Sequence, residues 1–233
     1  MATLVSGQKL PAGTALPVML NSELNAKKDR VGQKIEGKTM QDVPLVSGSR
    51  IKRGSKVTGH IVEVTRAADG GSAIVIRFDE LEDQGRAIRL TVSLRALAAS
   101  ESVFQAGLPI ETSSDSESSD QWVTRQVGGE VVNRSRGAVG SNTAIVGRWS
   151  EGVWAVLTPP LQGDCPDDEG DGREQAMWVF STSACGLYGL PNMMLAHAGR
   201  TDPVGQIRLE SPKQLMIRGG SGWLLLVTGP AVH

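Results

Sequence analysis

Two cysteines, Cys165 and Cys185, are the residues of this 233-residue chain whose type and spacing point most directly to chemistry. They lie twenty positions apart in turn-rich sequence, and an even number of cysteines in such a sequence favours a disulfide. Closing a loop of that length would stabilise the fold by about 3 kcal/mol in the chain-entropy model. The alternative is a pair of buried thiols in a reducing compartment. We predict the disulfide.

Cys185 also has a catalytic interpretation, because His197 follows it in the sequence. A thiolate activated by this imidazole is the nucleophile of a cysteine hydrolase, and the Cys185-Gly186 turn could offer N–H groups to an oxyanion. One of three aspartates would orient the ring: Asp164, Asp167 or Asp202. The spacing matches no motif, and a disulfide would remove the nucleophile. We therefore expect no catalysis and keep the Cys185/His197 hydrolase as the rival.

The acidic loop around Asp167–Asp171 could hold a cation. Four of its residues match positions 1, 3, 5 and 6 of an EF-hand loop, namely Asp167, Glu169, Asp171 and Gly172. Trp178 stands where that loop needs a bidentate glutamate, so a weak calcium site and a solvated acidic loop both remain open. We expect no cofactor, and the two cysteines and three scattered histidines lack the spacing of zinc ligands.

All five tryptophans fall in the second half of the chain: Trp122, Trp149, Trp154, Trp178 and Trp223. They either fill a core or line a surface that binds carbohydrate or peptide.

Residues 1–100 hold fifteen Lys and Arg against ten Asp and Glu, whereas the remainder holds nine against fifteen. The basic residues between Lys27 and Lys38 have no aromatic residues interleaved, which argues against binding of single-stranded nucleic acid.

The stretch Asp42–Glu63 organises the first half. Short apolar runs flank turns that we assign to Gly48, Gly54 and Gly59, because glycine reaches positive φ without a steric clash. Apolar residues alternate at period two on either side, and turn residues recur about every ten positions. This pattern predicts an all-β chain: a small antiparallel barrel or sandwich followed by a second β-rich domain. The only helix-like stretch is Arg95–Ser102.

We expect a tail at 1–9, a barrel domain at 10–100, a Ser/Asp/Glu-rich linker at 101–120 and the second β-rich domain at 121–233. No apolar run approaches the length of about 20 residues that a membrane helix needs. The first residues do not read as a signal peptide, so we expect any export signal to have been removed from this sequence.

Four segments in the first half together match the pattern of a known family: Leu10-Pro11-Ala12-Gly13-Thr14 with Leu16 and Leu20, Pro44-Leu45-Val46, Ile51–Gly59, and Ile76–Leu81 with Gly85. With these, residues 10–97 resemble the β-barrel domain of TrbI/VirB10-family proteins of type IV secretion channels. No apolar helical pair follows Leu97, where that family inserts its membrane-crossing helices. We assign no family to the second half.

The resemblance implies a bacterial cell-envelope protein that binds or assembles with other envelope or secretion-system proteins. Such a protein would be periplasmic, outer-membrane-associated or secreted, in keeping with a disulfide. The expected partners include no nucleic acid, and self-association stays open. The alternative functions are a carbohydrate- or peptide-binding module on the Trp-rich half and the Cys/His hydrolase.

Overall fold

The structure, a computed structural model, describes residues 10–45, 48–110, 123–134, 136–140, 144–160, 165 and 172–228. In these residues the chain is almost entirely β, with twenty strands and the α-helix α1 (Ser100–Gly107). The expected all-β class is therefore confirmed. The described residues include no helix with the length and apolar character that crossing a membrane requires.

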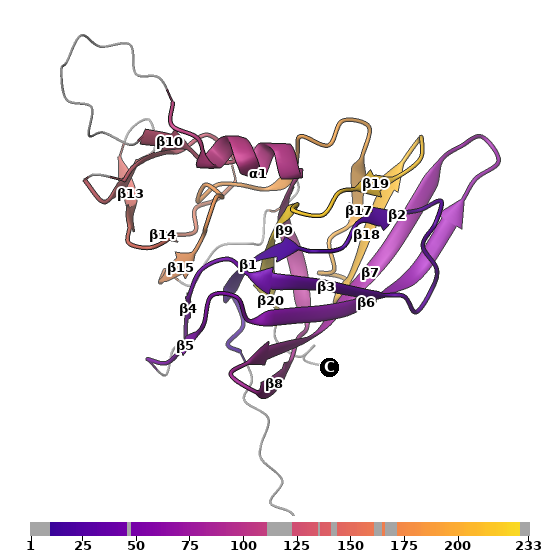
Figure 1. Cartoon of the computed structure of the whole chain (residues 1–233), viewed down its shortest axis with the longest axis horizontal. Coiled ribbons are helices and arrows are strands. Elements are labelled where there is room, and N and C mark those ends of the chain that lie inside the picture. Colours follow the sequence, from indigo (N-terminus) through magenta and orange to yellow (C-terminus); the bar gives the residue numbers. More distant parts are fainter. Residues whose placement is uncertain are drawn as a thin grey trace, which may run out of the picture.

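Ten strands form one sheet that curls into a nearly closed barrel (Figure 1). The order along the sheet is β16–β9–β20–β1–β3–β6–β7–β18–β17, and β8 pairs with β7. Where the two ends of the sheet approach each other, the Leu94 N–H donates a 2.8 Å hydrogen bond to the Ala198 carbonyl. The strands are β1 (Ala15–Leu20), β3 (Lys34–Thr39), β6 (Lys56–Arg66), β7 (Ser72–Asp83), β8 (Arg86–Arg89), β9 (Val92–Ala98), β16 (Gly186–Tyr188), β17 (Met194–His197), β18 (Gln206–Ser211) and β20 (Gly222–Val227).

The barrel interior is filled by the apolar residues that alternate along its strands. Period-two alternation sends every second side chain inward, so β6 and β7 bury residues such as Ile61, Ile74 and Ile76. Trp223 of β20 is fully buried and meets Phe78 edge to face, with ring centroids 5.8 Å apart. Trp223 is thus a core residue, and so one of the five tryptophans is excluded from any binding surface.

The glycines of the central stretch occupy positions that few other residues would tolerate. Gly48 and Gly54 have φ angles of +80° and +86°, in the left-handed region. Gly59 lies at a β-bulge between β6 and β7, where a Cβ atom would come within 2.1 Å of the Arg77 carbonyl oxygen. Gly54 therefore sets the turn into β6 as expected. Gly59 was assigned to a turn as well, but it lies within β6, where the absence of a side chain permits the close approach of β7.

A second, six-stranded antiparallel sheet follows α1, in the order β10–β11–β12–β13–β14–β15. Its strands are β10 (Val123–Arg125), β11 (Val131–Asn133), β12 (Ala138–Gly140), β13 (Ile145–Trp149), β14 (Val153–Val156) and β15 (Glu174–Ala176). Its buried side chains share a cluster with residues of β1, β9 and β20 that do not belong to the barrel interior, among them Ala15, Ala96 and Leu224. Figure 1 shows this sheet beside the barrel, with α1 running along the top of both.

Two short strand pairs complete the structure. Strand β2 (Leu24–Asn25) pairs with β19 (Met216–Ile217), and β4 (Val43–Pro44) pairs with β5 (Arg50–Ile51). The β4–β5 hairpin projects from the barrel toward β14 and β15 (Figure 1). It brings one end of the central stretch to the second sheet.

The division of the chain differs from the expected split into 10–100 and 121–233. Strands β16, β17, β18 and β20 come from the second part of the sequence, yet they belong to the barrel sheet. Residues 10–100 alone would leave the edges of β1, β7 and β9 without partners, and these later strands cover them. The second sheet is therefore an excursion between barrel strands.

The expected linker and helix also need correction. The linker was predicted to begin at residue 101, but residues 100–107 form α1, whose Ala106 is buried. The helix predicted at Arg95–Ser102 starts only at Ser100, because Arg95–Ala98 are the fully buried end of β9. Residues 111–120 and the expected tail at 1–9 lie outside the described residues.

Candidate functional site

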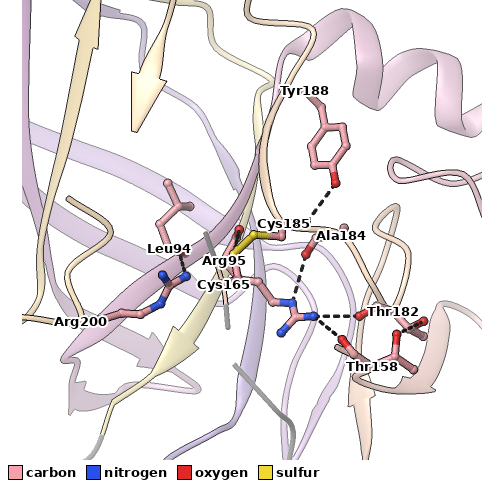
Figure 2. Close-up of a disulfide and its surroundings, with 9 residues drawn as sticks. All are labelled: Leu94, Arg95, Thr158, Cys165, Thr182, Ala184, Cys185, Tyr188 and Arg200. Carbon is pink, nitrogen blue, oxygen red and sulfur yellow. Dashed lines mark hydrogen bonds between the residues drawn. A yellow bond between two sulfur atoms is a disulfide. The ribbon is translucent and has the colours of Figure 1, made fainter. Parts of the chain in front are cut away.

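The predicted disulfide between Cys165 and Cys185 is present, with the Cα atoms 6.1 Å apart. Cys185 immediately precedes β16, which pairs in parallel with β9. Cys165 Sγ lies 3.4 Å from the carbonyl oxygen of Arg95 on β9. The bond therefore fixes residue 165 against the end of β9 (Figure 2).

Arg95 carries a fully buried guanidinium beside this disulfide. Its Nε donates to the Ala184 carbonyl at 3.1 Å, and one terminal nitrogen donates to the carbonyls of Thr158 and Thr182 at 2.7 and 3.1 Å. Figure 2 shows the side chain reaching from β9 into these loops. Buried charge is tolerated only when it is hydrogen-bonded in this way. Arg95 thus anchors the barrel to the loops that follow β14 and β15.

Glu130 extends this polar network on the side of the second sheet. The Thr182 N–H donates to its carboxylate at 2.9 Å, and the Thr182 hydroxyl donates to the other carboxylate oxygen. Burial raises the pKa of Glu130 above its ordinary value, and the two hydrogen bonds from Thr182 offset only part of that rise. Arg95 and Glu130 both act on Thr182, so they stabilise one conformation of that loop.

The hydrolase interpretation lacks its nucleophile in this structure, because the sulfur of Cys185 is bonded to Cys165. His197 Nδ1 accepts a 2.8 Å hydrogen bond from the Gly199 N–H, and Nε2 lies 2.8 Å from the Thr201 hydroxyl. These loop atoms hold the ring, and Asp202 does not contact it. Asp164 and Asp167 lie outside the described residues.

The calcium interpretation concerns Asp167–Asp171, which also lie outside the described residues. In the part of the chain that the structure describes, no three His, Cys, Asp or Glu side chains form a group able to hold a metal ion.

Two tryptophans of the second half meet at one surface pocket. Trp122 is not described, Trp223 is in the barrel core, and Trp178 is half-buried with its ring edge to face with Phe180. Trp149 and Trp154 belong to the β13–β14 hairpin and line a pocket of about 430 Å³. Its opposite wall comes from the β4–β5 hairpin, and its lining residues are Asp42, Arg50, Arg53, Arg148, Trp149, Ser150, Glu151 and Trp154. We call this the Arg–Trp pocket.

The indole of Trp154 lies between two guanidinium groups. The Cζ atoms of Arg50 and Arg148 are 5.7 and 5.4 Å from the ring centroid, within the range of cation–π attraction. The ring is 6% exposed, and its Nε1 donates to the Ser150 carbonyl at 2.8 Å. Trp154 therefore works as a fixed wall that orients the two arginines.

The charges of the pocket are only partly neutralised. Arg148 binds Glu174 in a bidentate pair, with its Nε 3.1 Å from both carboxylate oxygens and a terminal nitrogen at 2.9 Å. Arg50 and Arg53 are exposed, and among the described residues no ion pair joins either guanidinium to a carboxylate, although the charge of Arg50 helps to lower the pKa of Asp42. Two cationic groups thus remain free to bind a ligand.

Asp42 supplies negative charge at the rim. Burial disfavours its ionised form, but hydrogen bonds from the Arg53 N–H and the Lys52 ammonium outweigh this and lower its pKa below the ordinary value. The donor distances are 2.9 and 3.3 Å. Asp42 is therefore a carboxylate at neutral pH and is already engaged with its own hairpin.

Gln41 holds the two walls of the pocket together. Its side-chain amide donates to the Val153 carbonyl at 2.9 Å and accepts from the Val153 N–H at 3.1 Å, as a neighbouring strand would. The same oxygen accepts from the Trp178 N–H at 2.6 Å. The two bonds to Val153 are buried. The distance between the hairpins is therefore set by specific contacts.

Sequence reasoning did not find this pocket, because its walls lie about one hundred positions apart. The structure itself marks one wall of the pocket by its backbone. Glu151 sits at the tip of the β13–β14 hairpin with φ of +54°, a conformation that glutamate rarely adopts and that is enriched at functional sites. No protein-family model matches the sequence, and a comparison with curated proteins finds no match either. The function must therefore be argued from the site itself.

Proposed function

We propose that this chain is a non-catalytic binding and assembly protein of the bacterial cell envelope, acting outside the reducing cytosol. The observation that carries the proposal is the Arg–Trp pocket, to which the β4–β5 hairpin with its flanking residues and the β13–β14 hairpin of the second sheet both contribute side chains. Arginine and tryptophan are the residue types most enriched at protein-binding hot spots. The pocket walls are joined by buried hydrogen bonds of Gln41, so the site is formed before a ligand arrives.

The disulfide supports the proposed compartment. Structural disulfides persist in oxidising compartments and are rare in reducing ones. The Cys165–Cys185 bond therefore supports a periplasmic, outer-membrane-associated or secreted location. The resemblance of residues 10–97 to the TrbI/VirB10 barrel domain supports envelope or secretion-system proteins as partners.

A ligand-binding module on the Trp-rich half is the second candidate, because Trp149 and Trp154 line the pocket. A sugar ring would need an open indole face on which to stack, and Trp154 exposes 6% of its surface. Arginines occupy positions near that ring. This geometry favours a peptide over a carbohydrate, which brings the second candidate close to the first.

Site-specific photo-crosslinking in the producing cells tests the proposal. A photoreactive phenylalanine replaces the exposed Ser150 in the pocket, and the matched control carries it at the exposed Arg86 on β8. We expect discrete adducts with envelope proteins from position 150 and not from position 86. Thiol trapping in the same cells should find Cys165 and Cys185 oxidised. Equal adducts from both positions, or two reduced thiols in the cell, would contradict the proposal.

A further inference from the structure

We propose that the Arg–Trp pocket binds an acidic peptide segment of a partner protein and holds its carboxylates with Arg50 and Arg53. This inference rests on the proposed binding function and adds the chemical class of the ligand. It depends on three properties of the pocket: the free guanidinium groups, the aromatic wall and the acidic rim.

The two free guanidinium groups define the charge that the pocket prefers. Arg50 lies on β5 and Arg53 in the turn that follows it, and neither guanidinium forms an ion pair with a described carboxylate, although Arg50 acts on Asp42 through its charge. Arg148 shows what such a group does when a carboxylate is within reach, since it holds Glu174 in a bidentate pair. The planar fork of arginine matches a carboxylate in the same way when the carboxylate belongs to a ligand.

The aromatic wall prepares one of these groups for binding. The Arg50 guanidinium lies 5.7 Å from the Trp154 ring centroid, so part of its conformational freedom is already lost in the free protein. The half-buried Trp149 has the Arg134 guanidinium over its ring, 4.2 Å from the centroid, and the part of the indole that lines the pocket adds apolar surface for the methylene groups of a glutamate or aspartate side chain. A ligand with both a carboxylate and an apolar stem fits these two features together.

The acidic rim separates a peptide from a polyanion. Asp42 is ionised, and Glu151 is exposed at the hairpin tip beside it in the pocket lining. These carboxylates repel a continuous negative surface such as a membrane or a nucleic acid, but they accept hydrogen bonds from peptide N–H groups. The volume of about 430 Å³ is in the range of small-ligand sites and suits a short stretch of chain.

Fluorescence anisotropy with the full chain tests the inference. The probe is a fluorescein-labelled peptide with two glutamates set among neutral residues, and the matched probe has glutamine at both positions. We expect the acidic probe alone to bind. The Arg50→Gln/Arg53→Gln variant should bind it at least about tenfold more weakly, which corresponds to about 1.4 kcal/mol. Arg50→Lys/Arg53→Lys should also weaken binding, because lysine keeps the charge but loses the fork.

The control variant Arg86→Gln/Arg89→Gln removes the same charge from the exposed edge strand β8. We expect it to change the affinity for the acidic probe by less than about twofold, because Arg86 and Arg89 do not line the pocket and salt screens their charge. All four arginines are exposed, so the variants should keep the thermal stability of the parent. Equal weakening by both Gln pairs would show general charge attraction and overturn the assigned site.

Two further measurements separate this inference from the proposed function. Binding to vesicles containing phosphatidylglycerol, if stronger than to the acidic peptide and dependent on Arg50 and Arg53, would assign the pocket to a membrane surface and overturn the peptide. If the acidic probe does not bind at about millimolar concentration while crosslinks at position 150 persist, the ligand class is wrong and the binding function stands. If the purified chain binds the acidic peptide but position 150 gives no crosslinks in the cell, the ligand class stands and the proposed function in the envelope is wrong.

Discussion

Removal of the Cys165–Cys185 bond is expected to destabilise the protein by about 3 kcal/mol. The bond closes a loop with a sequence separation of 20, and the loop-closure entropy of the unfolded chain gives this figure at 25 °C. For a chain of 233 residues this corresponds to a fall in Tm of roughly 6–12 °C. Alanine is the suitable replacement, because both cysteines are buried and a serine hydroxyl would need a new hydrogen-bond partner.

The structure adds a second contribution through Arg95. Ala184, whose carbonyl accepts from the Arg95 Nε, directly precedes Cys185. Without the disulfide, this acceptor loses a covalent restraint, and the buried guanidinium loses part of its fixed environment. We therefore expect the effects of Arg95→Met and of the Cys165→Ala/Cys185→Ala pair to be coupled, with an interaction energy of about 0.5–3 kcal/mol in a double-mutant cycle.

The assay is thermal and urea unfolding of the oxidised parent and of the Cys165→Ala/Cys185→Ala variant, each with and without reductant. Reductant should lower the Tm of the parent to that of the variant and should leave the variant unchanged. A variant that melts within about 2 °C of the oxidised parent would refute the loop-closure reasoning, because the chain-entropy estimate for this loop length corresponds to a fall of at least about 6 °C. Additive effects in the cycle would refute the coupling alone.

Three further predictions concern the barrel and the buried network. Gly59→Ala should destabilise the protein by more than about 3 kcal/mol in urea unfolding, because its Cβ would lie 2.1 Å from the Arg77 carbonyl oxygen. Gly54→Ala should cost about 1 kcal/mol, because Gly54 has a φ of +86° but open space around it. Equal costs for the two substitutions would contradict the argument that β7 approaches Gly59 too closely for a side chain. Arg95→Met should cost about 3–5 kcal/mol, because the carbonyls of Thr158 and Ala184 lose their arginine donor and that of Thr182 keeps only the Thr158 N–H. The exposed Arg86→Met should cost less than about 0.5 kcal/mol, and similar melting of the two variants would contradict the anchoring role. Burial raises the pKa of Glu130, so the stability that its protonated form contributes is full below the ordinary pKa of 4.5 and is lost as the pH rises through the raised pKa of the folded protein. The free energy of unfolding of Glu130→Gln, relative to that of the parent, should therefore increase from pH 4 to pH 8. A constant difference would show that Glu130 does not titrate in this way.

Local sequence patterns determined the elements of this protein. Alternating apolar residues such as Ile74, Ile76 and Phe78 fix which side chains of a strand face a core, because the side-chain period of a strand is two. The positive φ of Gly54 and the pairing of Cys165 with Cys185 followed from residue type and spacing as well. Each of these depends on the residue itself or on a short segment around it.

The tertiary structure alone decided how the strands combine. The apolar residues of β9 indicate a strand, and both of its faces are buried, but they do not tell that β20 lies on one side of it and β16 on the other. The Arg–Trp pocket depends on the same long-range choice, since Arg50 reaches Trp154 only when the second sheet packs beside β1, β9 and β20. Strand neighbours distant in sequence are selected by the burial of whole faces and edges, and that free energy belongs to the assembled fold rather than to any one segment.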